Sequence, residues 1–186
     1  MEARAESVDR TRRRVLEAAT DLFGQRPFDL VSLADIAKTS GIGLATVVRQ
    51  FESKERLFAE AVSAARPIIE ARTADMVEND PGAAVRIALE NYEQFGDVIV
   101  RLVTQEERVP VIREVAEHGR RVHRAWVERV FTNALERARG GARKVRFAQL
   151  MAATDVLFWK LLRRDLKLGR RDTERAMIEI VEALCR

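Results

Sequence analysis

The sequence predicts an all-α protein made of an N-terminal three-helix domain and a longer C-terminal helical domain. Apolar residues recur at steps of three and four along most of the 186 residues, which is the spacing of amphipathic helices. No stretch of useful length alternates apolar and polar residues as a half-buried strand does. Hydrophobic residues make up 47% of the chain and charged residues 33%, a composition typical of an ordered, helix-rich protein.

Composition also indicates the cellular setting and the class of partner. The single cysteine, Cys185, excludes an internal disulfide framework and fits a reducing environment, so we expect a cytoplasmic protein. The apolar runs are too short for a membrane span, and the charged N-terminus does not resemble a signal peptide. The net charge of +4 permits a polyanionic partner without requiring one. Residues 1–54 carry nine basic against eight acidic side chains, a net of only +1.

The first predicted domain spans residues 1–52. Residues 1–8 are polar, and we expect a disordered arm there. A helix then begins in the basic run Arg10–Arg14 and ends near Gly24. The basic run is either a solvated helix face or a set of phosphate contacts, and the motif that follows favours phosphate contact. Phe28, in the turn after this helix, is predicted to fill the core of the three helices.

A helix-turn-helix is predicted over residues 33–54. Ser32 is a good N-cap for a helix over residues 33–39, which Gly41 ends by adopting a left-handed conformation. A second helix follows over residues 43–50, and Ser53 caps a third. In such a motif the second helix lies in the major groove of DNA.

Several residues of this region occur in the order and spacing of a known family. They are Val15, Leu16, Ala18, Ala19, Leu22, Phe23, Asp35, Ile36, Ala37, Gly41, Thr46, Phe51, Ser53, Lys54, Glu55 and Leu57. The segment from Thr11 to Val62 therefore resembles the DNA-binding domain of TetR-family transcriptional regulators. Three positions depart from the family pattern: Gly43 replaces the usual serine, Val48 the usual tyrosine and Gln50 the usual histidine. Because those side chains often touch phosphates in the family, we expect some of its backbone contacts to be missing or replaced here.

The DNA contacts that we expect fall into two groups. Thr46 and Arg49, with Leu44 and Ala45, face the bases, the apolar residues toward thymine methyl groups. The residues that hold phosphates, besides the N-terminal arginines, are expected to be Ser32, Gln50 and Lys54.

The second predicted domain spans residues 53–186 and is helical almost throughout. We expect helices over residues 53–78, 83–107, 120–137 and 143–166, a short one from Pro110 to Gly119, and a last one capped by Asp172 or Thr173. Pro67 either kinks the first of these helices or marks its end.

The resemblance implies an effector pocket among the middle helices. Its apolar lining is expected to be Tyr92, Phe95, Ile99, Leu102, Trp126, Met151 and Phe158, and its polar groups His123 and Asp155. The alternative is that these aromatic and apolar residues form an ordinary core. We expect a small apolar or aromatic effector. We expect neither a cofactor nor a metal, because His118 and His123 do not share a helix face.

The last two helices are strongly apolar and predict a homodimer interface. The resemblance favours this interpretation, because TetR-like regulators dimerise through their last two long helices. The expected interface residues are Trp159, Leu162, Met177, Ile180 and Leu184. The alternative is that the pair completes the protomer's own core, and each helix is expected to do some of both. Asp155 and Trp159 are one turn apart, which fits either a polar group in the pocket or an indole hydrogen bond in the dimer seam.

These observations predict a TetR-like regulator, a repressor that binds a pseudo-palindromic operator as a homodimer and is released by a small-molecule effector. The alternatives are an architectural or effector-independent DNA-binding protein and a purely structural helical bundle. The sequence contains no nucleophile paired with a base, no paired carboxylates, no glycine-rich phosphate loop and no Cys-x-x-Cys. We therefore expect no enzymatic activity.

Overall fold

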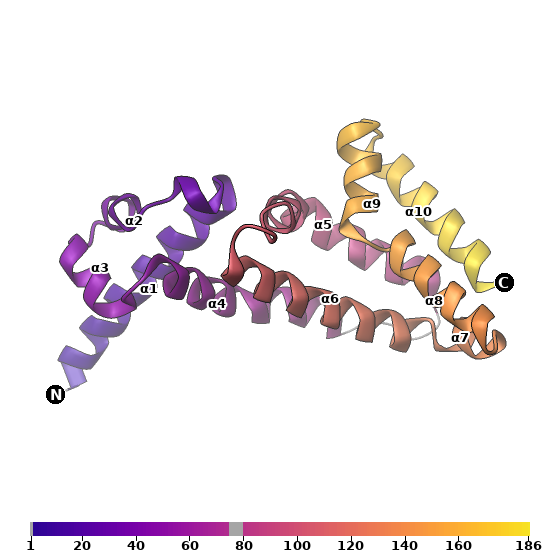
Figure 1. Ribbon diagram of the computed structural model, residues 1–186, viewed down its shortest axis with the longest axis horizontal. Helices are drawn as coiled ribbons and strands as arrows, with labels where there is room; N and C mark the ends of the chain where they lie inside the picture. The colour runs from indigo at the N-terminus through magenta and orange to yellow at the C-terminus, as the bar shows by residue number, and fades with distance from the viewer. Residues whose placement is uncertain (1, 75–79) are drawn as a thin grey trace. The chain divides into compact units, whose positions relative to one another are not determined.

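The fold is helical in a computed structural model that describes residues 2–74 and 80–186, and no strand occurs in these ranges (Figure 1). The all-α fold predicted from the sequence is thus confirmed. The chain forms two compact units. We call residues 1–68 with 105–115 the head unit, and residues 69–104 with 116–186 the bundle unit. The functional boundary predicted between residues 52 and 53 stays a prediction.

The head unit contains the predicted helix-turn-helix. Its elements are α1 (Glu2–Gln25), the 3₁₀ turn η1 (Phe28–Leu30), α2 (Leu33–Ser40), α3 (Leu44–Phe51), the first part of α4 (Lys54–Ala74) and the segment Gln105–Val115. Helix α1 begins at Glu2, within the segment for which the sequence predicts a disordered arm. The difference has a local reason, since alanine, glutamate and arginine in this stretch favour a helix.

The turn between α2 and α3 is fixed by local chemistry, as predicted. Ser32 Oγ accepts a hydrogen bond from the backbone N–H of Asp35 at 3.1 Å, and the Asp35 carboxylate accepts one from the backbone N–H of Ser32 at 2.9 Å. These two reciprocal hydrogen bonds satisfy backbone N–H groups that have no partner inside the helix, because they lie in its first turn. Gly41 ends α2 with φ +65°, the left-handed conformation that glycine adopts without strain. Ser53 Oγ accepts from the N–H of Arg56, which confirms the third predicted cap.

Three aromatic rings form the centre of the head unit. Phe23 stacks on Phe28 with ring centroids 5.5 Å apart, and Phe58 meets both rings edge-on. The predicted role of Phe28 is therefore confirmed, since only 4% of its surface is exposed. Val47 and Phe51 are fully buried, so one side of α3 is held in this core.

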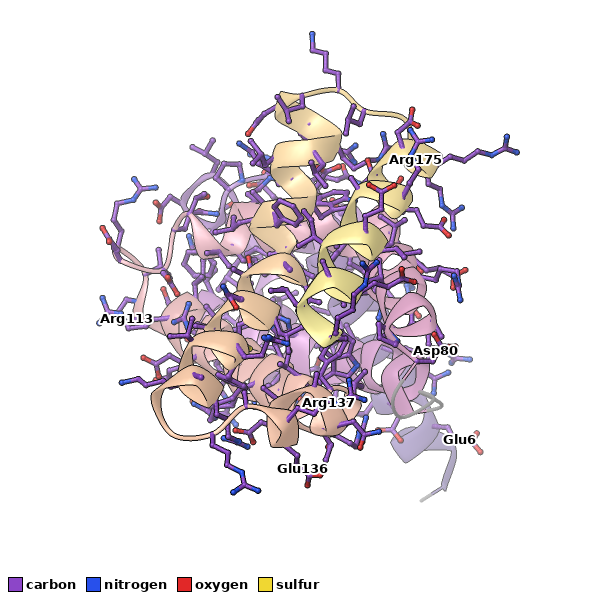
Figure 2. The ribbon with its side chains drawn as sticks, turned by 90° about the vertical axis from the view of Figure 1, so that its right-hand side faces the viewer. Glu6, Asp80, Arg113, Glu136, Arg137 and Arg175 are labelled. Atoms are coloured by element: carbon purple, nitrogen blue, oxygen red, sulfur yellow. The ribbon has the colours of Figure 1, made fainter. Side chains whose placement is uncertain are left out.

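The bundle unit is built from α5 onward. Its elements are α5 (Pro81–Val103), the larger part of α6 (Pro110–Val130), α7 (Thr132–Arg137), α8 (Gly141–Ala153), α9 (Val156–Lys160), the π-helical turn η2 (Leu161–Asp165) and α10 (Arg170–Cys185). Helix α10 packs against α5 and α8. Its C-terminal end is held by Arg137, whose Nη1 donates to the carbonyl oxygen of Cys185 at 2.8 Å (Figure 2).

At four places the helices of the structure differ from a predicted boundary or decide between two alternatives. Helix α6 continues through Gly119. Because this glycine is exposed, it destabilises the helix only through its low helix propensity, by about 1 kcal/mol. The helix ends at Val130 instead. The predicted helix over residues 143–166 is divided at Thr154, because the Asp155 carboxylate accepts a hydrogen bond from the N–H of Leu157 and starts α9.

The other two boundaries concern proline and the last helix. Helix α4 runs through Pro67, so this proline does not mark the helix end; the end expected near Glu78 lies outside the described residues. The last helix is capped by Gly169, three and four residues before the predicted caps Asp172 and Thr173.

Two glycines in the middle of helices predict opposite effects of the same substitution. A Cβ on Gly96 would lie 2.4 Å from the ring of Trp159, which is fully buried and has no room to move. Gly96→Ala is therefore expected to lower the free energy of unfolding by about 1–3 kcal/mol. No atom lies within 4 Å of a Cβ on Gly119, so Gly119→Ala is the matched control and is expected to stabilise by up to about 1 kcal/mol. Urea unfolding followed by tryptophan fluorescence measures both, and equal effects would contradict the packing described.

Candidate nucleic-acid interface and effector site

The exposed side of α3 is the candidate reading surface. Leu44 and Val48 are 46% and 42% exposed, and Ala45 and Arg49 are exposed beside them. Thr46 is half-buried at the edge of this surface. Of the four residues predicted to face bases, Leu44, Ala45 and Arg49 are exposed on α3, whereas Thr46 is half-buried; their contacts with bases stay predictions.

The residues predicted to hold phosphates lie in more constrained places. Ser32 is exposed, but its hydroxyl belongs to the cap with Asp35. Gln50 is half-buried, and its carboxamide oxygen has no hydrogen-bond partner within the described residues. Lys54 Nζ donates to the carbonyl oxygen of Phe28 at 3.0 Å and lies 4.2 Å from the centre of the Phe28 ring. Their roles toward DNA stay predictions.

The basic run of α1 divides into internal and external arginines. Arg12 pairs with Glu60 and lies over the Phe51 ring, and Arg14 Nη2 donates to the carbonyl oxygen of Ser40 at 2.6 Å. These two guanidinium groups therefore brace α1 against α4 and the end of α2. Arg10 and Arg13 are exposed, and neither has an ion pair with another described side chain. They are the arginines of this run best placed for an external anion.

In the bundle unit, four polar groups meet where α8 ends. Tyr92 on α5 donates from its hydroxyl to the carbonyl oxygen of Thr154 at 2.8 Å. His123 Nε2 lies 2.9 Å from Thr154 Oγ1, and His123 Nδ1 lies 4.0 Å from the Asp155 carboxylate. Two of the residues predicted to be polar effector contacts, His123 and Asp155, are therefore neighbours. Thr154, which is fully buried between them, was missed because a threonine on an apolar helix face carries no sequence signal for a site.

The hydrogen bonds assign the tautomer of His123. Thr154 Oγ1 donates its proton to the carbonyl oxygen of Leu150 at 2.8 Å, so this oxygen accepts from His123 Nε2–H. The unprotonated Nδ1 then faces Asp155. Burial lowers the pKa of His123 below its ordinary value of 6.5, and the negative charge of Asp155 opposes that shift. Burial also raises the pKa of Tyr92, and Asp155 adds to that rise. At neutral pH both groups are uncharged beside one carboxylate.

The apolar residues of the predicted pocket are distributed over the same unit. Trp126 is buried and stacks on His123 with ring centroids 5.7 Å apart. The others are partly buried residues, and most of them pack against the hydrophobic core: Tyr92, Phe95, Ile99, Leu102, Met151 and Phe158. Their role as an effector lining stays a prediction beside the alternative of an ordinary core.

The residues predicted for a dimer interface differ strongly in exposure. Trp159, Leu162 and Met177 are buried in the protomer's own core, so they have no surface to offer a second copy. Leu184 is partly buried, and Ile180 is 42% exposed. The exposed apolar side chains on α9 and η2, Leu157 and Leu161, were not among the predicted residues because helical spacing alone does not separate a core face from an outer face.

A half-buried ion pair between Glu93 and Arg163 explains the position of Trp159. Its indole Nε1 donates to Glu93 Oε1 at 2.9 Å, so the partner of the indole is Glu93 and not Asp155. Arg163 grips the same carboxylate through Nε at 2.6 Å and Nη2 at 2.8 Å. These hydrogen bonds lower the pKa of Glu93 to about 2. The cluster fixes η2 on α5 and was missed because the two partners are far apart in the sequence.

The described residues show neither a metal-binding group of side chains nor a membrane-spanning helix. No group of three or more His, Cys, Asp or Glu side chains there is arranged to hold a metal ion. Among the same residues, no helix combines the length and apolar character needed to cross a membrane.

Comparison with known proteins finds a family profile within the head unit. Residues 15–61 match the profile of the family described as "Bacterial regulatory proteins, tetR family", which covers α2, α3 and the flanking parts of α1 and α4. No curated protein matches the chain significantly.

Solved structures share the fold over almost the whole chain. A transcriptional regulator from Rhodococcus sp. Rha1 is 18% identical, with 93% of this chain and 95% of that chain covered and a TM-score of 0.72. A TetR-family transcriptional regulator from Mesorhizobium loti is 21% identical, with 95% and 96% covered and a TM-score of 0.66. A transcriptional regulator from Saccharomonospora viridis in complex with choline is 20% identical, with 94% and 96% covered and a TM-score of 0.70.

The cluster around Thr154 predicts a measurable electrostatic coupling. Asp155→Asn keeps a side chain that caps α9 but removes the negative charge, so the pKa values of both His123 and Tyr92 are expected to fall. NMR titration of the His123 imidazole measures the first shift. Asp165→Asn, which removes a carboxylate paired with Lys160, is the control and is expected to leave His123 unchanged.

The same titration fixes the sign of the pH effect on stability. Because the pKa of His123 is lower in the folded than in the unfolded chain, the unfolded chain binds a proton first as the pH falls. Its contribution to stability is therefore present above pH 6.5 and is lost as the pH drops toward the folded-state pKa. A His123 pKa that rises in Asp155→Asn would contradict this account.

Proposed function

We propose that this chain, whose residues 15–61 match the profile of the TetR family of bacterial regulatory proteins, represses transcription by binding a pseudo-palindromic DNA operator as a homodimer, and that a small effector releases it. The observation that carries the proposal is the geometry of α3. This helix is anchored from behind by the fully buried Val47 and Phe51, while Leu44, Ala45, Val48 and Arg49 face outward. A helix held in this way presents a fixed set of side chains to the major groove.

We propose distinct roles for the cations of the head unit. Arg49 is the one cation on the exposed side of α3 and reads guanine, whose O6 and N7 accept the two hydrogen bonds of a guanidinium group. Arg10 and Arg13 hold phosphates. Lys54 contributes indirectly by fixing the Phe28 carbonyl, and any contact with DNA requires it to leave that partner.

The effector is proposed to act on the bundle unit, at the polar cluster of Tyr92, His123, Thr154 and Asp155. The Saccharomonospora viridis regulator has this fold and holds choline, a small organic molecule. In the present chain, aromatic and apolar side chains surround one carboxylate and one neutral imidazole. This setting suits a small effector with an apolar or aromatic body and a polar group directed at Asp155.

The homodimer is proposed to form through the outer faces of α9, η2 and α10. Leu157, Leu161 and Ile180 are exposed apolar side chains on these elements, and solvent exposure of such a set is unfavourable in a monomer. A two-fold dimer supplies the second α3 that a pseudo-palindromic operator requires. Such a regulator acts in the cytoplasm and has no catalytic role.

Removal of the Arg49 guanidinium tests the reading surface. Arg49→Ala is expected to weaken binding to the specific operator by about 1–3 kcal/mol per half-site, with little change in folding because the side chain is exposed. Arg175→Ala removes the same charge from α10 and is the control (Figure 2). Fluorescence anisotropy with a labelled operator at fixed salt measures both. Unchanged affinity of the Arg49 variant would overturn this arrangement of α3 on DNA.

A charge on the proposed dimer face tests the assembly. Ile180→Glu is expected to convert the homodimer to monomers, because it buries an unpaired carboxylate in an apolar interface. Val122→Glu, on the exposed side of α6, is the control and is expected to leave the dimer intact. Light scattering during size-exclusion chromatography gives the mass of each. A dimeric Ile180 variant would place the interface elsewhere.

The effector step has its own test. A library of small organic molecules is titrated into the protein–operator complex, and the release of operator is followed by anisotropy. A true effector is expected to lose potency in Asp155→Asn while operator affinity without effector is unchanged. A complex that no compound dissociates would favour the effector-independent alternative.

A further inference from the structure

We propose that Leu44 and Val48 together read thymine methyl groups, so that the operator half-site requires thymine opposite both side chains. Val48 is thus a specificity-determining residue and not merely the loss of a phosphate contact. The inference rests on the proposed function, because it names the chemistry that the α3 surface recognises in DNA.

The exposed side chains of α3 form two neighbouring stripes along the helix. Successive residues turn by about 100° around a helix axis, so residues four apart lie on one stripe. Leu44 and Val48 form one such stripe, and Ala45 and Arg49 form the next. All four residues are exposed, whereas Val47 and Phe51, which form the stripe beside Leu44 and Val48, are fully buried. The outward surface of α3 therefore consists of three apolar side chains and one cation.

The outward surface of α3 has few groups that can form hydrogen bonds with bases. Arg49 is the one strong donor on it, and Thr46 at its edge is half-buried. Gln50 carries its carboxamide oxygen on the buried side. A reading helix of this composition cannot distinguish most base pairs by hydrogen bonding. The C5-methyl group of thymine is the apolar feature of the major groove, and branched side chains recognise it by contact.

The start of α3 is open, so that DNA can come close to Leu44. Gly43 immediately precedes α3, and no atom lies within 4 Å of the position of a Cβ on it. The start of the helix therefore has no side chain that would hold DNA away from Leu44. Close approach is what a methyl contact needs, because dispersion attraction falls steeply once a gap opens between the two groups.

The decisive experiment removes the methyl group from DNA and leaves the protein intact. Operators are first selected from random-sequence duplex DNA with the full-length protein. Deoxyuridine is then placed at each selected thymine in turn, since uracil differs from thymine only by the C5-methyl group. We expect affinity to fall about fourfold for each methyl group that contacts Leu44 or Val48, and more when both half-sites are substituted.

The protein side of the experiment identifies which residue reads which methyl. Val48→Ala is expected to bind the normal operator more weakly and to lose the deoxyuridine penalty at one position of each half-site. Leu44→Ala is expected to lose it at another position. Leu30→Ala, which shortens a 62% exposed leucine outside α3, is the matched control and is expected to keep every penalty.

The outcomes separate the inference from the proposed function. Selected operators that bind equally well with deoxyuridine, or that lack thymine in their half-sites, would overturn the methyl readout while the regulator proposal stands. Full penalties retained by both alanine variants would overturn it as well. Failure to select any sequence at all would overturn both proposals.

Discussion

The backbone N–H and the backbone carbonyl of Phe28 are both hydrogen-bonded, the carbonyl to Val31 N–H as well as to Lys54, and the head unit depends on this pairing. The ring of Phe28 is buried between Phe23 and Phe58, which draws its backbone away from water. A buried backbone N–H or C=O without a partner costs about as much as a lost hydrogen bond. Here the N–H donates to Gln105 Oε1 at 3.0 Å, and the carbonyl oxygen accepts from Lys54 Nζ at 3.0 Å.

This constraint explains why a segment distant in sequence belongs to the head unit. Gln105 is 4% exposed, and Val109 and Ile112 after it are also buried. Residues 105–115 thus supply both a hydrogen bond and apolar area to the domain that carries α3. In the bundle unit a half-buried carboxylate is paired in a similar way, since Glu93 accepts hydrogen bonds from Trp159 and Arg163.

Local signals made the head unit largely predictable from sequence. The cap of Ser32, the left-handed Gly41 and the anchor Phe28 each depend on residues within a few positions, so pattern and propensity identify them. The phosphate contacts were harder, because whether Lys54 or Arg14 has an internal partner depends on packing between elements.

The bundle unit was less predictable for a physical reason. An apolar stripe shows that a helix packs against something, but it does not show whether the partner is the same chain or a second copy. Trp159 and Met177 were therefore assigned to an interface although they lie in the core. The sequence did not predict the division of the helix at Thr154. The apolar spacing continues across Asp155, and only the folded structure shows that this residue is the N-cap of α9. The Tyr92–His123–Thr154 cluster joins three helices that only tertiary structure brings together.

The most direct test of the whole account is a binding titration of the full-length protein against fragments that cover the genome of its source organism. The titration is carried out at fixed salt with excess nonspecific competitor DNA. We predict that a few fragments form a discrete complex that survives the competitor, with protection of two symmetric half-sites facing one side of the DNA. Weak binding that is equal on every fragment and disappears with salt would contradict the claim that α3 is a sequence-reading helix.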